Sequence, residues 1–281
     1  MKFNLSILSF AILLPLGHAP AQQNEGQPGR GDSAITRVSV IAIGDPPEPR
    51  MDIQGEFRVL VDVPESEYPP QRLFVPQRGS SREEVFIGMN APSSQFEYRG
   101  PSTLRLQERR ERGEGNFSYS DYADVNLAAP GQDSTIVLMR SRPGASWRSA
   151  PRSMVFRNDT ESFPLGTARI FNFSSKPLIF RVGDGEPFGL NPRAVRVVPV
   201  SGEIFLYSIA WLDNDEPQII AQDHASAFQN GDRINLVAYD TDSNNPNARS
   251  EPIRFSTYFE FAPYSGGSGE TPDEGDSADE Q

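Results

Sequence analysis

The sequence predicts an all-β protein, and three observations support this fold class. Short runs of β-branched and aromatic residues are separated by clusters of Gly, Pro, Asp and Asn, which form turns. The runs recur about every 8–12 residues, as in an antiparallel sandwich or barrel. No segment sustains the apolar period of an amphipathic helix. The chain has 281 residues, of which 37% are hydrophobic, and its 18 Phe and 8 Tyr supply bulk for one or two cores.

The individual elements follow from these runs. In one clear alternation, Phe57, Val59 and Val61 share a face of an expected strand. The one helix candidate is Asp223–Gln229, with Asp223 as its N-cap. The expected strands, in chain order, are Ile35–Ile43, Glu56–Val63, Arg72–Val75, Glu83–Met89, Thr103–Gln107, Asp124–Ala128, Ser134–Arg140, Arg152–Arg157, Thr167–Phe173, Pro177–Val182, Arg193–Val200, Glu203–Leu212, Gln218–Ala221, Arg233–Tyr239 and Ile253–Phe261.

The length of the chain favours two domains over one. A polar run, Asn158–Pro164, separates two expected strands and marks the boundary. The prediction is therefore two immunoglobulin-like antiparallel β-sandwich domains, residues 34–160 and residues 161–263. A distant tandem duplication is a further hypothesis. Its proposed counterparts are Phe74 with Phe171, Val85–Phe86 with Leu178–Ile179, Ile136–Leu138 with Ile234–Leu236, and Val155 with Thr257.

The first 21 residues have the pattern of a secretory signal peptide. Lys2 provides the positive charge, Leu5–Leu16 is the apolar region, and Ala19-Pro20-Ala21 is a small-residue cleavage site. The apolar region is too short to span a bilayer, so it is not expected to be a transmembrane anchor. We therefore expect cleavage near Ala21 and an extracytoplasmic protein, either periplasmic or secreted.

Two further terminal segments are expected to be disordered. Residues 22–33 are polar and rich in Gly and Pro, as in a flexible linker. Residues 264–281 contain six acidic residues, no Lys or Arg, and too few apolar groups to form a core, which predicts a disordered acidic tail. The net charge of the chain is −12, and no segment offers the basic patch that nucleic-acid binding requires.

The residue inventory excludes several chemistries. Without Cys there is no disulfide, thiol nucleophile or Cys-based zinc site, and His18 and His224 are the only histidines. A zinc or copper centre, or a serine hydrolase site with a histidine base, is therefore not expected. The densest basic cluster is interleaved with glutamates, so it predicts a solvated hairpin tip rather than an anion site. This cluster consists of Arg105, Arg109, Arg110 and Arg112.

A possible metal site is the segment from Asp240 to Glu251. Counting Asp240 as position 1, Asp242 and Asn244 fall at positions 3 and 5, and Glu251 falls at position 12, which is the spacing of a calcium loop. Asn245 stands where that loop has Gly, and no helix is expected on either side. The same residues also fit an Asx-rich loop whose side chains bond to their own backbone. Both interpretations stay open.

Aromatic residues also align along one expected strand. Phe205, Tyr207 and Trp211 share a face with Ile209, an arrangement that can stack sugar rings if it is exposed. The opposite face, which begins at Ile204, is also apolar. A strand that is apolar on both faces is normally buried, which favours a core role.

The segment Ser162–Ser174 resembles a signature of uncharacterised secreted bacterial β-sandwich proteins. The shared pattern is Phe163-Pro164, Gly166, Arg169 and Asn172, followed by a Gly-containing hairpin at 181–189. The resemblance covers mainly residues 160–260 and implies a sandwich fold and export. From the residues themselves, Asn172 is expected to bind a neighbouring turn through its side chain.

We expect an exported, non-enzymatic binding or structural protein of the bacterial envelope. Its partner would be an envelope protein or glycan that the sequence does not identify, and the oligomeric state is equally undefined. The alternative is a carboxylate-based carbohydrate-active enzyme, because sandwich folds can hold paired acids. Glu203, Glu216 and Glu260 are candidates, but no pattern selects a pair.

Overall fold

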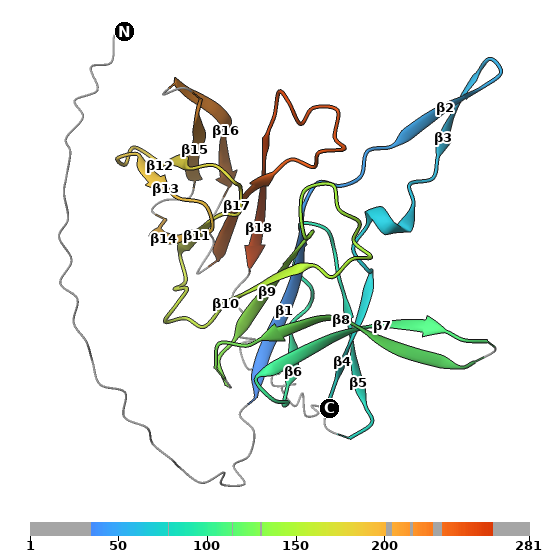
Figure 1. The fold of residues 1–281 in the computed structure, drawn as a ribbon. Helices are drawn as coiled ribbons and strands as arrows, with labels where there is room; N and C mark the ends of the chain where they lie inside the picture. The colour runs from blue at the N-terminus through green and yellow to red at the C-terminus, as the bar shows by residue number, and fades with distance from the viewer. Residues whose placement is uncertain are drawn as a thin grey trace, which may run out of the picture. The chain divides into compact units, whose positions relative to one another are not determined.

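The computed structural model describes residues 35–260 apart from residues 78, 114, 130, 201–203, 214–215 and 227–231. Within this part of the chain it has 18 strands, one short 3-10 helix and no α-helix, which confirms the all-β prediction (Figure 1). No helix among the described residues is long and apolar enough to cross a membrane. The expected signal peptide, linker and acidic tail lie outside the described residues.

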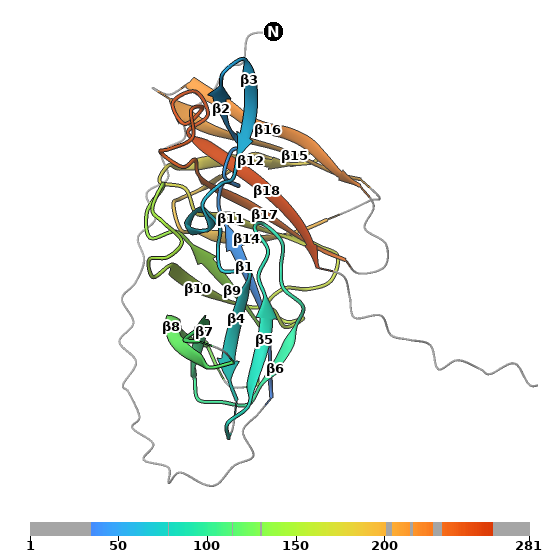
Figure 2. The same ribbon diagram turned by 90° about the vertical axis from the view of Figure 1, so that its right-hand side faces the viewer.

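The first half of the chain forms a sandwich-like pair of four-stranded sheets, here called the first sandwich (Figures 1 and 2). The strand orders are β10-β9-β1-β6 and β5-β4-β7-β8. A buried core that includes Val40, Leu73, Leu104 and Leu138 lies between the sheets. The bounds are β1 Thr36–Ile43, β4 Arg72–Pro76, β5 Arg82–Phe86, β6 Phe96–Tyr98, β7 Thr103–Glu111, β8 Phe117–Asn126, β9 Ser134–Met139 and β10 Arg152–Arg157.

A separate two-stranded hairpin, β2 (Arg50–Gln54) and β3 (Phe57–Val61), is inserted between β1 and β4. All five residues of β3 are exposed, in agreement with the absence of a covering sheet around the hairpin among the described residues. The short 3-10 helix η1 (Glu65–Glu67) follows the hairpin and returns the chain to β4.

The second half forms the second sandwich, with the strand orders β14-β11-β17-β18 and β13-β12-β15-β16. Its core includes Ile170, Phe180, Ile209 and Leu236. The bounds are β11 Thr167–Asn172, β12 Leu178–Val182, β13 Phe188–Leu190, β14 Val195–Pro199, β15 Ile204–Asp213, β16 Glu216–Ser226, β17 Arg233–Asp240 and β18 Ile253–Glu260.

The two sandwiches have the same strand order once the β2–β3 hairpin is left out. The sequence β6-β1-β9-β10 corresponds to β14-β11-β17-β18, and β5-β4-β7-β8 corresponds to β13-β12-β15-β16. In both, the central pair (β1 with β9, β11 with β17) is parallel, and the β7–β8 and β15–β16 ladders each contain one register shift. Immunoglobulin-like topology is not confirmed: the first two strands of that fold are neighbours, whereas β1 lies between β6 and β9.

This correspondence corrects part of the residue matching expected from the sequence. Ile136–Leu138 and Ile234–Leu236 do occupy corresponding strands, β9 and β17. Phe74 lies in β4, whose counterpart is β12, so its match with Phe171 in β11 is wrong. The match of Val85–Phe86 with β12 residues is wrong for the same reason. Apolar rhythm alone does not distinguish one strand of a sandwich from its neighbour.

A third core joins the two sandwiches along the sheets β10-β9-β1-β6 and β14-β11-β17-β18. We call it the shared core, and it contains Ile41, Val137, Phe171 and Val237 from the four central strands. Because successive side chains of a strand point to opposite faces, the residues at even positions of these strands face the core of their own sandwich instead. Phe171 also meets Phe156 of β10 edge to face, with ring centroids 4.8 Å apart. The central strands are therefore buried on both faces.

The structure overturns two local expectations. The prediction of a helix over Asp223–Gln229 is wrong for residues 223–226, because β16 continues there as a strand that is hydrogen-bonded to β15. Tertiary pairing here outweighs a local capping signal. The core role expected for the aromatic face of β15 is confirmed, since Phe205 and Ile209 enter the second core, but burial of the opposite face is wrong, because Leu206 is 54% exposed. The short strands β2, β6 and β13 were also missed.

The segment between β10 and β11 is held by buried polar contacts. Arg169 of β11 pairs with Glu260 of β18 at 3.3 Å and donates from Nε to Asn235 Oδ1 at 2.9 Å. Its guanidinium also lies 4.1 Å from the ring centroid of Phe163. Burial lowers the pKa of Arg169, and the nearby Glu260 carboxylate opposes that change. A buried charge is tolerated when its partners are this complete.

Asp159 caps the first turn of the same segment. Its carboxylate accepts hydrogen bonds from the backbone N–H of Ser162 at 2.9 Å and of Glu161 at 3.1 Å, and from Arg157 Nε at 2.9 Å. Burial opposes ionisation of this carboxyl, but these donors together hold the pKa of Asp159 below its usual value.

We predict that Asp159→Ala lowers the free energy of unfolding at neutral pH by about 1 kcal/mol, the typical loss of a capping side chain. Because the pKa of Asp159 is lower in the folded protein, its stabilising effect is complete above the unfolded value of about 3.9 and disappears as the pH falls through the folded value. Urea denaturation of both proteins across this range measures the difference. A difference that does not shrink at the acidic end would contradict the prediction.

Candidate functional site

The structure places the residues of the expected calcium loop against different partners. Asp240, at the end of β17, accepts hydrogen bonds at Oδ1 from the backbone N–H of Ser175 at 2.9 Å and from its Oγ at 3.0 Å. Glu251 pairs with Arg254 at 3.4 Å. The Asp240 carboxylate thus binds a turn of the second sandwich, and the Glu251 carboxylate pairs with a side chain of β18.

Asp242 and Asn244 instead contact the first sandwich. The buried Asp242 carboxylate forms an ion pair with Arg140 and accepts the Gly144 N–H at 2.9 Å, and Asn244 donates to the Gly144 carbonyl at 3.4 Å. The backbone N–H of Asp242 donates to Asp45 at 2.9 Å. The φ of Gly144 is 75°, a conformation that favours glycine at this close approach. The loop therefore joins the two sandwiches at one end of the shared core.

Calcium binding by this loop stays a prediction. Among the described residues there is no group of three or more His, Asp or Glu side chains placed to hold a metal ion. The loop does make an Asx-type bond, since Asn245 Oδ1 accepts the N–H of Asn247 at 2.9 Å. This pattern favours the Asx-rich loop interpretation.

We predict that the melting temperature is the same in excess calcium and in excess EDTA, because Arg140 already balances the buried carboxylate of Asp242. Differential scanning calorimetry at equal ionic strength measures this. A rise of several degrees that is specific to calcium, absent with magnesium and lost in Asp240→Asn, would contradict the prediction and support a calcium loop.

In the segment that resembles the secreted-protein signature, Asn172 and Arg169 are buried and have structural roles. The prediction that Asn172 binds a neighbouring turn is confirmed: it donates to the carbonyls of Lys176 at 2.9 Å and Leu190 at 2.8 Å and accepts from Ser174 Oγ at 2.7 Å. Asn172 is fully buried, as is most of Arg169. These residues hold the second sandwich together and do not line a ligand cavity.

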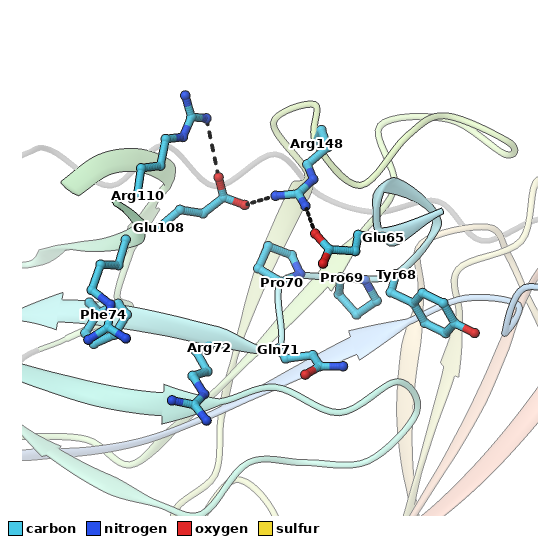
Figure 3. Close-up of a pocket in the computed structure, with 11 residues that line it drawn as sticks. Glu65, Tyr68, Pro69, Pro70, Gln71, Arg72, Phe74, Glu108, Arg110 and Arg148 are labelled. Atoms are coloured by element: carbon cyan, nitrogen blue, oxygen red, sulfur yellow. Dashed lines mark hydrogen bonds and ion pairs between the residues drawn. The ribbon is translucent and has the colours of Figure 1, made fainter. Parts of the chain in front are cut away.

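A different cavity combines concave shape with converging charged groups. We call it the arginine pocket, and its volume is about 310 Å³. η1, the chain after it, β4, β7 and the loop after β9 contribute to it (Figure 3). The residues that line it are Glu65, Tyr68, Pro69, Pro70, Gln71, Arg72, Phe74, Glu108, Arg109, Arg110 and Arg148.

Backbone contacts fix the loop that carries Arg148. The N–H of Trp147 donates to the carbonyl of Ser66 in η1 at 3.0 Å, and the Trp147 carbonyl accepts from the Tyr122 hydroxyl, also at 3.0 Å. The Trp147 ring is buried in the first core. Arg148 is therefore held beside both η1 and the β7–β8 hairpin, although these segments are far apart in the sequence.

A buried carboxylate lies in the wall of the pocket. Glu108 of β7 is 8% exposed, and its Oε2 accepts a hydrogen bond from Arg110 at 3.5 Å. Its Oε1 is buried without a hydrogen-bond partner, and the nearest cationic nitrogen, Nη1 of Arg148, is 3.6 Å away. The same guanidinium pairs with Glu65 at 2.8 Å, so it lies between the two carboxylates (Figure 3). Burial raises the pKa of the nearby Tyr122, and the negative charge of Glu108 adds to this effect.

A row of arginines and aromatic rings continues from the pocket across the outer face of the sheet β5-β4-β7-β8. We call it the arginine–aromatic ladder, and it consists of Arg82, Tyr119, Phe74, Arg109 and Phe117. Arg82 lies 3.9 Å from the Tyr119 ring centroid, and the Tyr119 and Phe74 centroids are 5.3 Å apart. Arg109 lies 5.1 Å from Phe74 and 4.5 Å from Phe117. Each contact is a cation–π or edge-to-face pair.

Among the four arginines that line the pocket, Arg109 has no acidic partner in the described part of the chain. Within the described part of the chain, Arg109 forms no ion pair with a carboxylate, and its contacts are the two aromatic rings. The pocket as a whole has four arginines and two glutamates in its lining. Its local charge is therefore positive on a chain whose net charge is −12, and it is suited to binding an anion.

This site was not predicted from the sequence. It correctly predicted a hairpin around Arg109 and Arg110, which are exposed on β7, but treated the interleaved acids as solvated, whereas Glu108 is buried. The one local signal was the alternation of Phe117 and Tyr119 on β8, which lie opposite Glu111 and Arg109 of β7. His224, the remaining histidine after the expected cleavage, lies in β16 opposite Leu206.

No protein-family model matches the chain, and no curated protein matches it. The function of the arginine pocket is therefore inferred from its own geometry.

Proposed function

We propose that this chain is an exported, non-enzymatic binding protein of the bacterial envelope, and that it holds an anionic ligand in the arginine pocket. The observation that carries the proposal is Arg109, whose guanidinium is held by the rings of Phe74 and Phe117 and lacks a carboxylate partner among the described residues. Stacking restrains the planar guanidinium while its N–H groups stay available at the edge. Such a group can donate two parallel hydrogen bonds to a carboxylate, sulfate or phosphate.

Charge and shape support the same proposal. A single exposed ion pair contributes little in water, but Arg72, which pairs with Glu84, and Arg110 and Arg148 line the same cavity as Arg109. Convergent charges reinforce one another, and the low-dielectric walls formed by Tyr68 and the prolines reduce screening. We expect modest affinity that falls as the salt concentration rises.

Export and domain organisation belong to the same proposal. The pattern of residues 1–21 supports a leader that is removed near Ala21, with the mature protein in the periplasm or secreted. The matched strand orders support two domains, residues 34–160 and residues 161–263, that arose by tandem duplication. The β2–β3 hairpin would then be an insertion in the first copy.

We predict that Arg109→Gln weakens the binding of inorganic sulfate at low ionic strength by about tenfold, the effect of losing one charge-assisted contact. Chemical shifts of the arginine side chains in NMR titrations measure the affinity. Arg105→Gln is the matched control, because Arg105 lies on the same strand, is exposed, and pairs with Asp121 and Asp124 outside the pocket.

Two results would contradict the proposal. One is sulfate binding that survives Arg109→Gln unchanged. The other is an equal loss of affinity in the Arg105→Gln control, which would indicate non-specific attraction by the positive charge of the hairpin.

A second candidate function is a carboxylate-based carbohydrate-active enzyme, because Glu65 and Glu108 face the same cavity (Figure 3). A glycosidase holds the scissile bond between its two carboxyl groups. Here the guanidinium of Arg148 occupies the space between them, at 2.8 Å from Glu65 and 3.6 Å from Glu108, which favours binding over hydrolysis. Release of reducing ends from a polysaccharide, lost in both Glu65→Gln and Glu108→Gln, would favour the enzyme instead.

A further inference from the structure

We propose that the ligand of the arginine pocket is an acidic polysaccharide, a chain of sugar rings that bear carboxylate or sulfate groups. This inference rests on the proposed function, because it names the class of anion that the same pocket binds.

A simple anion cannot supply a hydrogen-bond donor to the carboxylate in the wall of the pocket. Glu108 lies in the wall, and its Oε1 is buried without a hydrogen bond. A buried carboxylate oxygen without a hydrogen bond is costly, even 3.6 Å from Nη1 of Arg148, and only a donor relieves that cost. Sulfate and phosphate supply only acceptors, so they can bind the arginines but leave this oxygen without a hydrogen bond. A sugar supplies hydroxyl donors for Glu108 and, if it is acidic, an anionic group for Arg109.

An apolar surface next to the charged groups of the pocket also favours a sugar. Tyr68 is 39% exposed and, with Pro69 and Pro70, forms a wall of the pocket. Phe117, 49% exposed, lies against the other side of Arg109. Flat apolar surfaces beside a few directed polar groups are what the C–H faces and hydroxyls of a sugar ring require.

The size of the cavity and the basic groups beyond it also favour a chain of sugars. A cavity of about 310 Å³ is at the small end of ligand sites and holds about one ring. The site does not end there, since Arg82, Arg72 and Arg109 come from the neighbouring strands β5, β4 and β7. Arg72 lies at one end of the β4–β5 ladder, opposite Phe86, and Arg82 at the other end, opposite Pro76. Basic groups are thus spread over the sheet, and a chain with repeated acidic groups can contact several of them at once.

The test is calorimetric titration of the full mature chain with four probes. These are a trigalacturonate, a sulfated trisaccharide, a neutral trisaccharide and inorganic sulfate, all at the same ionic strength. We expect at least one acidic trisaccharide to bind about tenfold more tightly than sulfate, and the neutral one to show no binding. Which acidic trisaccharide binds more tightly distinguishes uronate from sulfate chains.

Two variants separate sugar recognition from anion binding. Glu108→Gln and Tyr68→Ala are each expected to weaken binding of the acidic trisaccharide severalfold more than they weaken binding of sulfate. Tyr68 is partly exposed and lies outside the three cores, so its variant remains informative if Glu108→Gln fails to fold.

The outcomes also separate this inference from the proposed function. Arg109-dependent sulfate binding, with acidic trisaccharides no tighter than sulfate, would overturn the polysaccharide and leave anion binding intact. Acidic trisaccharide binding that neither variant weakens would likewise overturn it. If neither sulfate nor any trisaccharide binds, both proposals fall.

Discussion

The shared core between the two sandwiches is the constraint on which the rest of the structure depends. Four central strands, β1, β9, β11 and β17, supply side chains to it from one face and to a sandwich core from the other. Each fully buried aliphatic or aromatic side chain contributes about 1.5–3 kcal/mol, so residues such as Ile41 and Phe171 stabilise both halves together. Neither sandwich can expose its inner sheet without leaving this surface in water. The two halves are therefore expected to fold and unfold as one unit.

This arrangement determines where a ligand can bind. The central strands that meet in the shared core have no free face, and at its ends Arg140 pairs with Asp242 and Arg169 with Glu260. The outer sheets and the loops at the ends of the sandwiches remain accessible to a ligand. The arginine pocket is located there, at one end of the first sandwich, and its ladder lies on an outer sheet. The shared core and the proposed ligand site thus lie on different sheets of the first sandwich.

Much of the fold was predictable from the sequence because the core strands are long and apolar. The segment Ser134–Arg140 was expected within one residue of β9, and Arg152–Arg157 matches β10. Short strands such as Phe96–Tyr98 were missed, since three residues carry no periodicity. The extent of β16 was missed because its pairing with β15, not its own apolar pattern, makes it a strand.

The site was less predictable, for a physical reason. Arg148 reaches Glu108 only because Trp147 anchors its loop between η1 and Tyr122, and that contact depends on packing between segments far apart in the chain. Nothing in the residues around Glu108 distinguishes a buried glutamate from the exposed ones beside it. At the expected calcium loop, local spacing matches a motif, whereas the partner of Asp242 lies in the other sandwich and could not be read from the sequence.

The two tryptophans of the chain provide the most direct measurement of the shared core. Trp147 packs in the first core and Trp211 against the second, so Trp147→Phe and Trp211→Phe each leave one fluorescent probe in a single sandwich. We predict that, in each variant, urea unfolding followed by that fluorescence and by circular dichroism gives one coincident transition. Separate midpoints for the remaining tryptophan and for the strand signal would show that the sandwiches unfold independently, which would contradict the coupling proposed here.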